Sequence, residues 1–309
     1  MAWYKIFHNL NKKYSTWYIF VLILLIAFIG RYIVRKTLPI REKFTKIDKF
    51  ELKEGDDVFD SFYVNYYDEL LYNGDKNNYE IGKINETTNL TNESRVLDIG
   101  SGTGHHLNLL ADLEIPAIGL DKSRYMTEYA SATYPKLDFQ TGDALTKNYP
   151  SGSFSHIFIL YFTVYYFKDK KTLFENCYKW LAPGGYLILH LVNKHKFNPV
   201  IPKSNVIRNV NLQKYKDGRI IKSITKIDDF NYTSEFILEN RDNSTESIFT
   251  EKFIDKYSQT RQNNHILYME KQSEILSLVK NIGFILESKI DMDEIDYKDQ
   301  YLYILKKPE

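Results

Sequence analysis

The sequence predicts an α/β fold in which short buried strands alternate with helices along most of the chain. An apolar segment at 96–99 is followed by a glycine-rich turn and by helical spacing to about Leu113. Apolar segments of strand length recur at 117–121 and 153–160. Such alternation favours a mostly parallel sheet with helices on both faces. With 309 residues and 43% hydrophobic content, the chain can bury one sizeable core plus an accessory element.

The glycine-rich turn follows the first of these strands. It places glycines at 100, 102 and 104, with Asp98 two positions before the first. Glycine permits backbone conformations closed to other residues and lets a ligand approach the main chain. The following helix directs its free N–H groups and positive dipole end at the turn. The turn therefore predicts a site for an anionic or carboxylate-bearing small molecule, and its spacing differs from the G-x-G-x-x-G of dinucleotide sites.

The D-x-G-x-G-x-G pattern resembles the S-adenosylmethionine loop of class I methyltransferases. Further landmarks follow in the family's order: an acid ending the strand at 117–121, the pair Gly142–Asp143 after a short strand, and a Pro-Gly-Gly turn at 183–185. The resemblance covers about residues 58–309. It implies a Rossmann-like, seven-stranded, mostly parallel sheet with an antiparallel last strand, and S-adenosyl-L-methionine as the cofactor.

The same resemblance implies roles for individual residues. Asp98 and the glycine loop would line the methionine and ribose side of the cofactor, Asp121 would accept hydrogen bonds from the ribose hydroxyls, and Asp143 would lie beside the adenine amino group. The candidate cofactor-binding residues are Asp98, Gly100, Ser101, Gly102, Thr103, Gly104, Asp121, Lys122, Met126, Asp143, Ala144, Tyr63 and Tyr67.

Residues 58–71 carry aromatic side chains at helical spacing. They resemble the helix that many small-molecule methyltransferases lay across the cofactor. Tyr63 and Tyr67, four residues apart, share one face and are expected to reach the methionine carboxylate or the substrate. Core packing is the alternative role for both.

The acceptor side of the predicted site opens after the fourth strand, at 160–166. The N/D-P-P-Y/F motif of methyltransferases that act on nucleobase or amide nitrogen is replaced by Leu-Tyr-Phe-Thr, which argues against that class. The catalytic candidates are Tyr161 here and two histidines, His190 and His265, whose unperturbed pKa suits a general base. A structural or substrate-lining role is the alternative for both histidines. No metal-ligand spacing is present, so we expect no metal.

Residues 203–265 alternate polar and apolar residues and predict strands of an antiparallel sheet inserted after the fifth core strand. The family often places such an insertion over the active site as a substrate cap. An amphipathic helix is expected at 271–281, followed by the last two strands at 284–290 and 301–306.

The N-terminus predicts a membrane anchor. After a tail at 1–13, the 17 residues from Tyr14 to Gly30 carry no charge, which is at the short end of a bilayer span. We expect a single-pass anchor at 14–34 and a basic linker at 35–57. A cleaved signal peptide is less favoured because basic residues follow the run instead of a small-x-small cleavage site, and a buried soluble helix is the other alternative.

The charge around the span favours a catalytic domain on the cytoplasmic side, because more basic residues follow the span than precede it. Glycosylation sequons at 85–87, 89–91 and 92–94 would suit a lumenal face, but chance matches are expected in an asparagine-rich chain. The lone cysteine, Cys177, excludes an internal disulfide. A net charge of +1 gives no reason to expect a nucleic-acid partner.

These features predict a membrane-anchored methyltransferase that moves a methyl group from S-adenosylmethionine to a small-molecule or lipid acceptor by in-line displacement. The alternatives are a protein methyltransferase and a non-catalytic scaffold that binds the cofactor. The sequence indicates neither the acceptor atom nor the oligomeric state.

Overall fold

The computed structural model describes residues 20–26, 50–199, 212–216, 219–238 and 245–309. The chain divides into two compact units, Met1–Lys43 and Phe44–Glu309. In the first unit, residues 20–26 are helical and their large apolar side chains are 52–61% exposed, Val21 excepted. Most of the predicted anchor at 14–34 lies outside the described residues. Within the ranges given, no helix is both long and apolar enough to cross a membrane.

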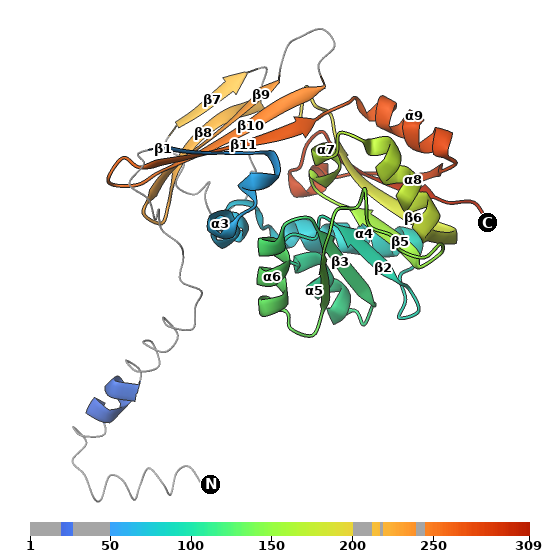
Figure 1. Ribbon diagram of the computed structural model, residues 1–309, viewed down its shortest axis with the longest axis horizontal. Helices are drawn as coiled ribbons and strands as arrows, with labels where there is room; N and C mark the ends of the chain where they lie inside the picture. The colour runs from blue at the N-terminus through green and yellow to red at the C-terminus, as the bar shows by residue number, and fades with distance from the viewer. Residues whose placement is uncertain (1–19, 27–49, 200–211, 217–218, 239–244) are drawn as a thin grey trace, which may run out of the picture. The chain divides into compact units, whose positions relative to one another are not determined.

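The second unit contains a seven-stranded sheet with the order β12-β13-β6-β5-β2-β3-β4 (Figure 1). Five strands are parallel to one another, and β13 runs antiparallel to its neighbours β6 and β12. The predicted mostly parallel sheet with an antiparallel last strand is therefore confirmed. The strands are β2 (Val96–Ile99), β3 (Ala117–Asp121), β4 (Asp138–Thr141), β5 (Phe154–Ile159), β6 (Leu181–Val192), β12 (Ile285–Asp291) and β13 (Gln300–Lys306).

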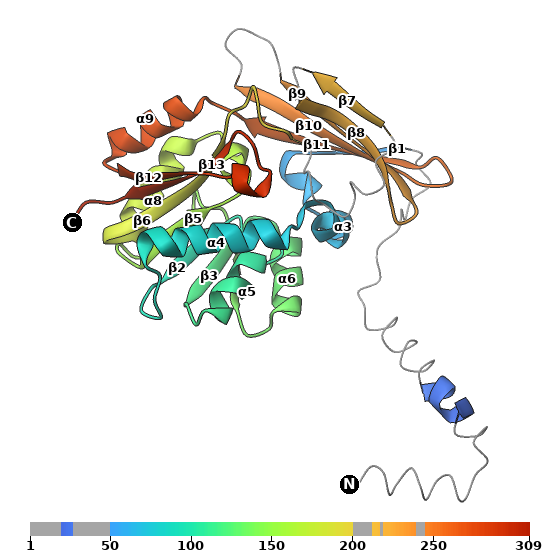
Figure 2. The same ribbon diagram turned by 180° about the vertical axis from the view of Figure 1, so that it is seen from behind.

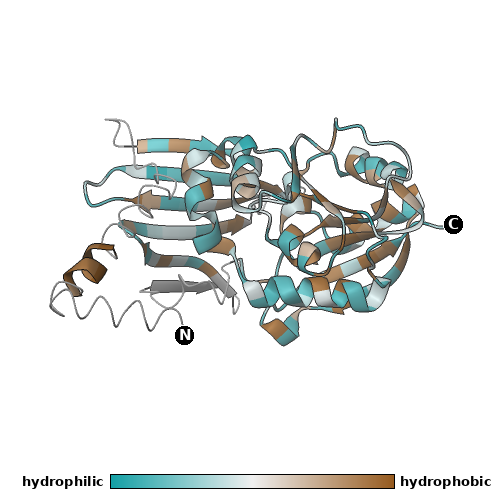
Figure 3. Cartoon of the chain, turned by 90° about the horizontal axis from the view of Figure 1, so that it is seen from below, coloured by the Kyte–Doolittle hydropathy of each residue, from teal (hydrophilic) through white to brown (hydrophobic). Residues whose placement is uncertain are grey.

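Helices cover both faces of this sheet, because alternate strand residues point to opposite sides. On β5, Ile157 packs in one core cluster with α8 and α9, while Phe158 packs in a second cluster with α4 and α5. Figure 1 shows α8 in front of the sheet, and Figure 2, from behind, shows α4. Figure 3 shows the apolar strands between more polar helices. The helices are α3 (Ser61–Leu71), α4 (Gly74–Thr88), α5 (His105–Asp112), α6 (Arg124–Thr133), α7 (Thr163–Tyr166), α8 (Lys170–Trp180) and α9 (Gln272–Ile282), with 3₁₀ turns η1 (Gly55–Val58) and η3 (Asp293–Ile295).

A second sheet of six strands, which we call the cap sheet, has the order β1-β11-β10-β9-β8-β7. Its five later strands are antiparallel, which confirms the predicted β-rich insertion. They are β7 (Leu212–Lys216), β8 (Arg219–Ile227), β9 (Phe230–Leu238), β10 (Glu246–Ile254) and β11 (Thr260–Tyr268).

Before residue 90, the structure contains a strand and a helix that were not predicted from the sequence. The segment 50–54, expected to be linker, forms strand β1 and pairs in parallel with β11, and η1 follows it. Helix α4 was not predicted either, because its glycines and asparagines are weak helix formers. It is held by burial of Ile81 and Ile84 against the sheet.

Helix α3 lies against the cap sheet. Phe62 and Tyr66 of α3 share an apolar cluster with Phe230, Tyr232 and Phe253 of the cap. The rings of Phe62 and Phe253 meet edge to face, 5.3 Å apart between centroids. The helix that carries Tyr63 and Tyr67 is thus fixed by the inserted sheet.

Candidate active site

A cavity of about 790 Å³ lies at the carboxyl edge of the central sheet, where α3, α4, α7 and β11 also contribute lining residues. In a sheet of this topology, the carboxyl ends of the parallel strands form the usual ligand crevice. The volume lies within the range of small-molecule and cofactor sites. The cavity therefore brings the glycine loop, the helix preceding the core and the cap to one place.

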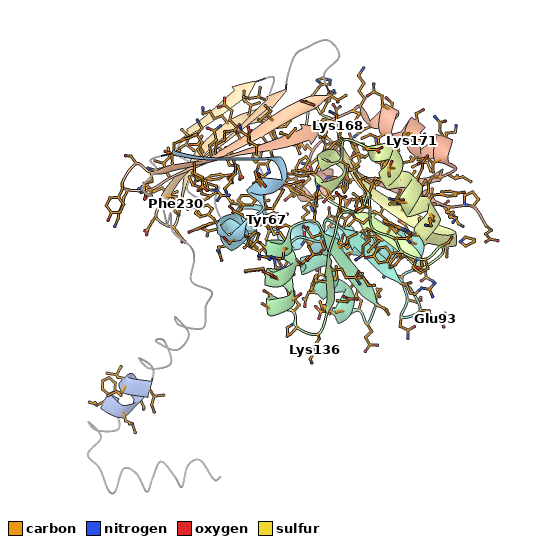
Figure 4. The ribbon with its side chains drawn as sticks, in the orientation of Figure 1. Tyr67, Glu93, Lys136, Lys168, Lys171 and Phe230 are labelled. Atoms are coloured by element: carbon orange, nitrogen blue, oxygen red, sulfur yellow. The ribbon has the colours of Figure 1, made fainter. Side chains whose placement is uncertain are left out.

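The glycine loop forms the floor of the cavity and fits closely against its neighbours. Gly100 has a φ of +74°, and a Cβ added there would lie 2.4 Å from Cγ2 of Thr163 on α7. A Cβ on Gly102 would lie 3.5 Å from the ring of Tyr67 on α3. Figure 4 labels Tyr67 on this helix. Only glycine can adopt this backbone conformation at position 100 without strain and also leave room for the side chain of Thr163.

Two buried side-chain oxygen atoms lie at the cavity without a hydrogen-bond partner in the part of the chain that the structure describes. They are Oδ2 of Asp98, whose residue is 2% exposed, and Oγ of Ser101. Burial raises the pKa of Asp98 to about 7. An unsatisfied buried carboxyl is costly unless a donor meets it. Asp98 is thus suited to receive a cationic or hydrogen-bond-donating group of a ligand.

Asp121 ends β3 with its carboxylate fixed by the backbone. Its Oδ2 accepts from the N–H of Gly102 at 2.9 Å, and its Oδ1 accepts from the N–H of Ser123 at 2.8 Å. Burial raises the pKa of Asp121, and these two backbone N–H groups oppose the rise. Each oxygen retains capacity for a further hydrogen bond. The carboxylate can therefore accept from two neighbouring hydroxyls, such as those of a ribose.

Two acidic side chains, Asp56 and Asp143, border the next part of the cavity, and Lys122 lies between them. Lys122 Nζ lies 2.6 Å from Oδ2 of Asp56 and 3.1 Å from Oδ2 of Asp143. The backbone N–H of Leu145 also donates to Asp143 at 2.9 Å. Apolar side chains also line the cavity, and such a lining suits the faces of an adenine: Leu120, Met126, Ala144 and Leu145.

The remaining wall is aromatic. Phe59, Tyr67, Tyr161 and Tyr166 line it together with Tyr268 of the cap. Phe59 and Tyr166 meet edge to face, with ring centroids 5.5 Å apart. Lys168 stands nearby after α7 and is labelled in Figure 4. Such a wall suits an acceptor with an apolar or cationic part.

The structure brings most predicted cofactor residues to this cavity. Those that line it are Asp98, Gly100, Ser101, Gly102, Thr103, Asp121, Lys122, Met126, Asp143, Ala144 and Tyr67, and the catalytic candidate Tyr161 lines it too. Gly104 instead caps the start of α5 with a φ of +89°. Tyr63 is 1% exposed and contacts Phe59, Tyr67 and His265, as expected from its alternative role in core packing.

Neither histidine predicted as a base lies on the cavity wall. His190 is fully buried on β6, and burial lowers its pKa to about 3. His265 is 2% exposed but hydrogen-bonds through Nδ1 to the hydroxyl of Tyr166, which does line the cavity. His156 lies outside as well, and burial lowers its pKa to about 4. Among the residues described above, no three His, Cys, Asp or Glu side chains form a metal-binding group.

Several lining residues were missed by the sequence analysis. Lys76 and Asn77 come from α4, and Ile266 comes from β11. They depend on α4 and on strand packing, for which the sequence carries no local signal. Thr163 and Tyr166 of α7 also line the cavity, and they lie within the stretch 160–166 that was predicted for the acceptor side.

A methyltransferase-domain family model matches residues 96–185. Phosphoethanolamine N-methyltransferase 1 of Arabidopsis thaliana is 32% identical over 109 residues, which cover 34% of this chain and 22% of that protein. Phosphoethanolamine N-methyltransferase of Plasmodium falciparum is 32% identical over 115 residues, covering 35% of this chain and 42% of that protein. The chain thus spans less than half the length of these relatives.

Solved structures share the fold over a longer part of the chain. An S-adenosylmethionine-dependent methyltransferase from Clostridium acetobutylicum has a TM-score of 0.61 and 18% identity, covering 80% of this chain and 98% of its own. The SAM-bound amino pentose methyltransferase CalS10 from Micromonospora echinaspora has a TM-score of 0.54 and 18% identity, covering 79% and 96%. The family model and the relatives show a methyltransferase domain within the chain, at residues 96–185, and the two solved structures share its fold.

Proposed function

We propose that this protein transfers the methyl group of S-adenosylmethionine to a small-molecule acceptor. The observation that carries the proposal is a single cavity that joins the carboxylates of Asp98 and Asp121 to an aromatic wall formed in part by the cap sheet. When bound, the cofactor supplies a sulfonium methyl group as electrophile. The chain supplies position, desolvation and proton handling.

We propose the following roles for the cofactor side. Asp98, whose Oδ2 has no hydrogen-bond partner among the described residues, takes the ammonium of the methionine portion, and the loop from Gly100 to Thr103 lies along it. Asp121 takes the ribose hydroxyls. Asp143 and the apolar slot beside Met126 hold the adenine. Support comes from the burial of Asp98 and from the capacity of Asp121 to accept beyond its two backbone bonds.

A small acceptor is favoured over a protein side chain. The aromatic side chains of Tyr67, Phe59 and Tyr166 line the acceptor side of a cavity of about 790 Å³, a volume typical of small-molecule sites. Two of the similar proteins are named for methylating phosphoethanolamine, and CalS10 for an amino pentose. Small amines are therefore the first acceptors to test, with lipid head groups beside them.

The test uses the full-length chain. Calorimetric titration with S-adenosylmethionine and S-adenosylhomocysteine should give micromolar binding of both. Transfer of labelled methyl from S-adenosylmethionine is then followed with phosphoethanolamine, an amino pentose, ethanolamine lipid in vesicles and histone-type peptides. Transfer to a peptide alone favours a protein methyltransferase. Cofactor binding without transfer to any acceptor in the panel favours the scaffold alternative.

We also propose that residues 14–34 anchor the chain in a membrane, with the unit Phe44–Glu309 on the cytoplasmic side. Support comes from the uncharged run of the sequence and from the exposed apolar side chains of residues 20–26. The full chain should float with vesicles after alkaline washing, whereas a chain lacking residues 1–36 should not. A chain lacking only residues 1–13 is the matched control, and its release from vesicles would argue against the anchor.

A further inference from the structure

We propose that Tyr166, His265 and Glu251 form a proton relay that deprotonates the methyl acceptor, and that the acceptor reacts through the nitrogen of a primary or secondary ammonium. The inference rests on the proposed methyl transfer and names the chemistry of its acceptor. Tyr166 is the residue that would touch the acceptor. His265 and Glu251 act through it and are positioning residues.

The three side chains are joined in a line that begins at the cavity and ends inside the cap. The hydroxyl of Tyr166 lies 2.9 Å from Nδ1 of His265, and Nε2 of His265 lies 2.7 Å from Oε2 of Glu251. Tyr166 comes from α7, while His265 lies on β11 and Glu251 on β10, where Glu251 pairs with Asn263, two residues before His265. The relay therefore depends on the insertion being folded over the central sheet.

The direction of the hydrogen bonds follows from Glu251. An ionised carboxylate only accepts, so Nε2 of His265 carries the proton in the Nε2···Oε2 bond. In a neutral imidazole the other nitrogen, Nδ1, is then an acceptor. The Tyr166 hydroxyl donates to Nδ1, and its own oxygen remains free to accept from a group in the cavity. This is the arrangement of nucleophile, base and orienting acid that recurs in catalytic triads.

Glu251 is held as a carboxylate by its surroundings, although it is fully buried. Burial alone would raise the pKa of Glu251, but His265 and the hydroxyls of Tyr232 and Tyr63 outweigh it and leave the pKa below its usual value. Tyr232 donates to Oε1 at 2.5 Å, and Asn263 lies 3.5 Å from Oε2. A buried acid with this many donors can stabilise an imidazolium beside it.

Tyr166, the residue of the relay that lines the cavity, lies close to the cofactor loop. The side chain of Thr163 packs against Gly100 of the cofactor loop, where an added Cβ would lie 2.4 Å from its Cγ2. Thr163 precedes Tyr166 on α7 by three residues, about one helical turn. The aromatic neighbours of Tyr166 at the cavity are Phe59 and Tyr67, whose rings can stack against a cation. The charged or titratable groups that act on Tyr166 are Tyr67, Glu251 and Asp56, and those around His265 are Tyr63, Tyr166 and Glu251.

The chemistry requires such a relay when the acceptor is an ammonium. An ammonium nitrogen has no lone pair, so one N–H bond must break before the nitrogen can attack the methyl carbon. In the proposed step, that proton passes to the oxygen of Tyr166 as the Tyr166 proton passes to Nδ1 of His265, forming an imidazolium beside the Glu251 carboxylate. The nitrogen then bonds the methyl carbon as the carbon–sulfur bond breaks and sulfur keeps the electron pair. The proton on His265 returns through Tyr166 to solvent after product release.

The first experiment needs no acceptor. In full-length protein labelled with ¹⁵N-histidine, the His265 signal is assigned by its loss in His265→Gln. We expect a neutral ring with its proton on Nε2, and a shift of the Nδ1 signal in Tyr166→Phe that Tyr257→Phe does not produce. Tyr257 is the control because it is 72% exposed. A ring with its proton on Nδ1 would make Tyr166 an acceptor from His265 and would overturn the relay.

The second experiment uses whichever panel acceptor the full-length protein methylates. At pH 7 only about one alkylamine molecule in a few thousand is deprotonated. Tyr166→Phe is expected to lower kcat/KM by about 10²–10⁴ at pH 7, with cofactor affinity unchanged within twofold. Free amine becomes abundant at high pH. The factor by which Tyr166→Phe lowers kcat/KM should therefore be at least ten times smaller at pH 9.5 than at pH 7. His265→Gln and Glu251→Gln should follow the same profile, and Tyr257→Phe should match the unsubstituted protein.

The outcomes separate this inference from the proposed function. A Tyr166→Phe deficit that is equal at pH 7 and 9.5, or no deficit, would overturn the relay while methyl transfer stands. Methylation of an acceptor atom that carries no proton, such as a thioether sulfur, would do the same. Absence of transfer by the unsubstituted protein would overturn the proposed function, and the histidine spectrum would still decide whether the hydrogen-bond direction in the relay is right.

Discussion

The guanidinium of Arg261 on cap strand β11 makes two parallel hydrogen bonds with the carboxylate of Asp60, the residue before α3. Nη1 lies 2.9 Å from Oδ2 and Nη2 lies 3.0 Å from Oδ1. Oδ1 of Asp60 also accepts from the first N–H groups of α3, at Phe62 and Tyr63. One carboxylate therefore caps α3 and attaches it to the cap sheet, and α3 in turn carries Tyr67 to the cavity.

Replacing one partner of this pair should destabilise the protein strongly. Arg261 is 2% exposed, and Arg261→Met removes both hydrogen bonds from its guanidinium to Asp60, which then keeps only the more distant Lys53, at 3.7 Å, as a cationic partner. We expect a loss of about 2–4 kcal/mol in the free energy of unfolding, somewhat below the range for fully buried pairs because the Asp60 side chain is 21% exposed. Chemical denaturation measures the loss. Arg124→Met is the matched control, since Arg124 pairs with Glu128 at the surface and should change stability by less than about 0.5 kcal/mol.

A double-mutant cycle tests whether the two residues act together. Asp60→Asn keeps an N-cap acceptor but removes the charge, so Arg261→Met combined with Asp60→Asn should cost less than the sum of the single changes. Strictly additive losses would show that the Arg261–Asp60 pair contributes no coupling, and that packing of Arg261 over the Phe62 ring dominates instead.

Asp121 should contribute directly to cofactor affinity. Asp121→Ala removes two acceptors for ribose hydroxyls and also releases the N–H of Gly102 in the glycine loop. We expect S-adenosylmethionine to bind more weakly by about 1–3 kcal/mol, measured by calorimetry. Asp138→Ala is the control, because Asp138 is exposed on the neighbouring strand β4 and does not line the cavity. Equal affinities in both variants would refute the ribose assignment.

The parts of the fold that the sequence predicted are those encoded over short distances. The loop after β2, the acid ending β3 and the Pro-Gly-Gly sequence, which lies within the first residues of β6 and not before it, are local motifs whose chemistry depends on neighbouring residues. Strand β1 could not be predicted in this way, because its partner residues at 260–264 lie about two hundred positions away in the chain. Pairing at that distance is decided by the folded cap, not by the five residues of the strand.

In the candidate site, too, the residues in local motifs were predicted and those placed by long-range packing were not. Asp98, Asp121 and Asp143 were implied by the resemblance of their local motifs to those of class I methyltransferases, and all three line the cavity. His265 was proposed as a base from its residue type alone, whereas the structure places it behind Tyr166, which lies in the predicted acceptor stretch 160–166 but had no role of its own assigned. Which histidine reaches a cavity depends on the register of β10 and β11 against α7, and this register has no local sequence signature.

Cofactor affinity should depend on pH through Asp98. Burial raises its pKa to about 7, so the group is mainly protonated below pH 7 in the protein without ligand. A cationic ammonium favours the carboxylate form, so binding should release a proton and the affinity should rise from pH 6 to pH 7.5. Above about pH 8 the ammonium of the ligand itself deprotonates and the trend should reverse.

Calorimetry at several pH values, in two buffers with different ionisation enthalpies, measures both the affinity and the proton release. Asp98→Asn should bind more weakly, and its affinity should be flat between pH 6 and 7.5. The sign for stability is the opposite: because the folded pKa is raised, the contribution of Asp98 to stability is greatest at low pH and is lost as pH rises toward 7. A rising limb that persists unchanged in Asp98→Asn would assign the pH dependence to another group.

Gly100→Ala should show how tightly the glycine loop is held against α7. The substitution places a Cβ at a φ of +74°, 2.4 Å from Cγ2 and 2.6 Å from Oγ1 of Thr163. Gly152→Ala is the matched control, because Gly152 has a φ of +71° but its added Cβ would have its nearest contact at 3.8 Å. The control should lose about 1–2 kcal/mol of unfolding free energy from the backbone conformation alone, and Gly100→Ala should lose about 1–3 kcal/mol more from the steric clash.

Combining Gly100→Ala with Thr163→Ala removes both clashing atoms and should restore most of that additional loss. If the double variant is no more stable than Gly100→Ala, the loop position is set by the backbone and not by the contact between Gly100 and Thr163.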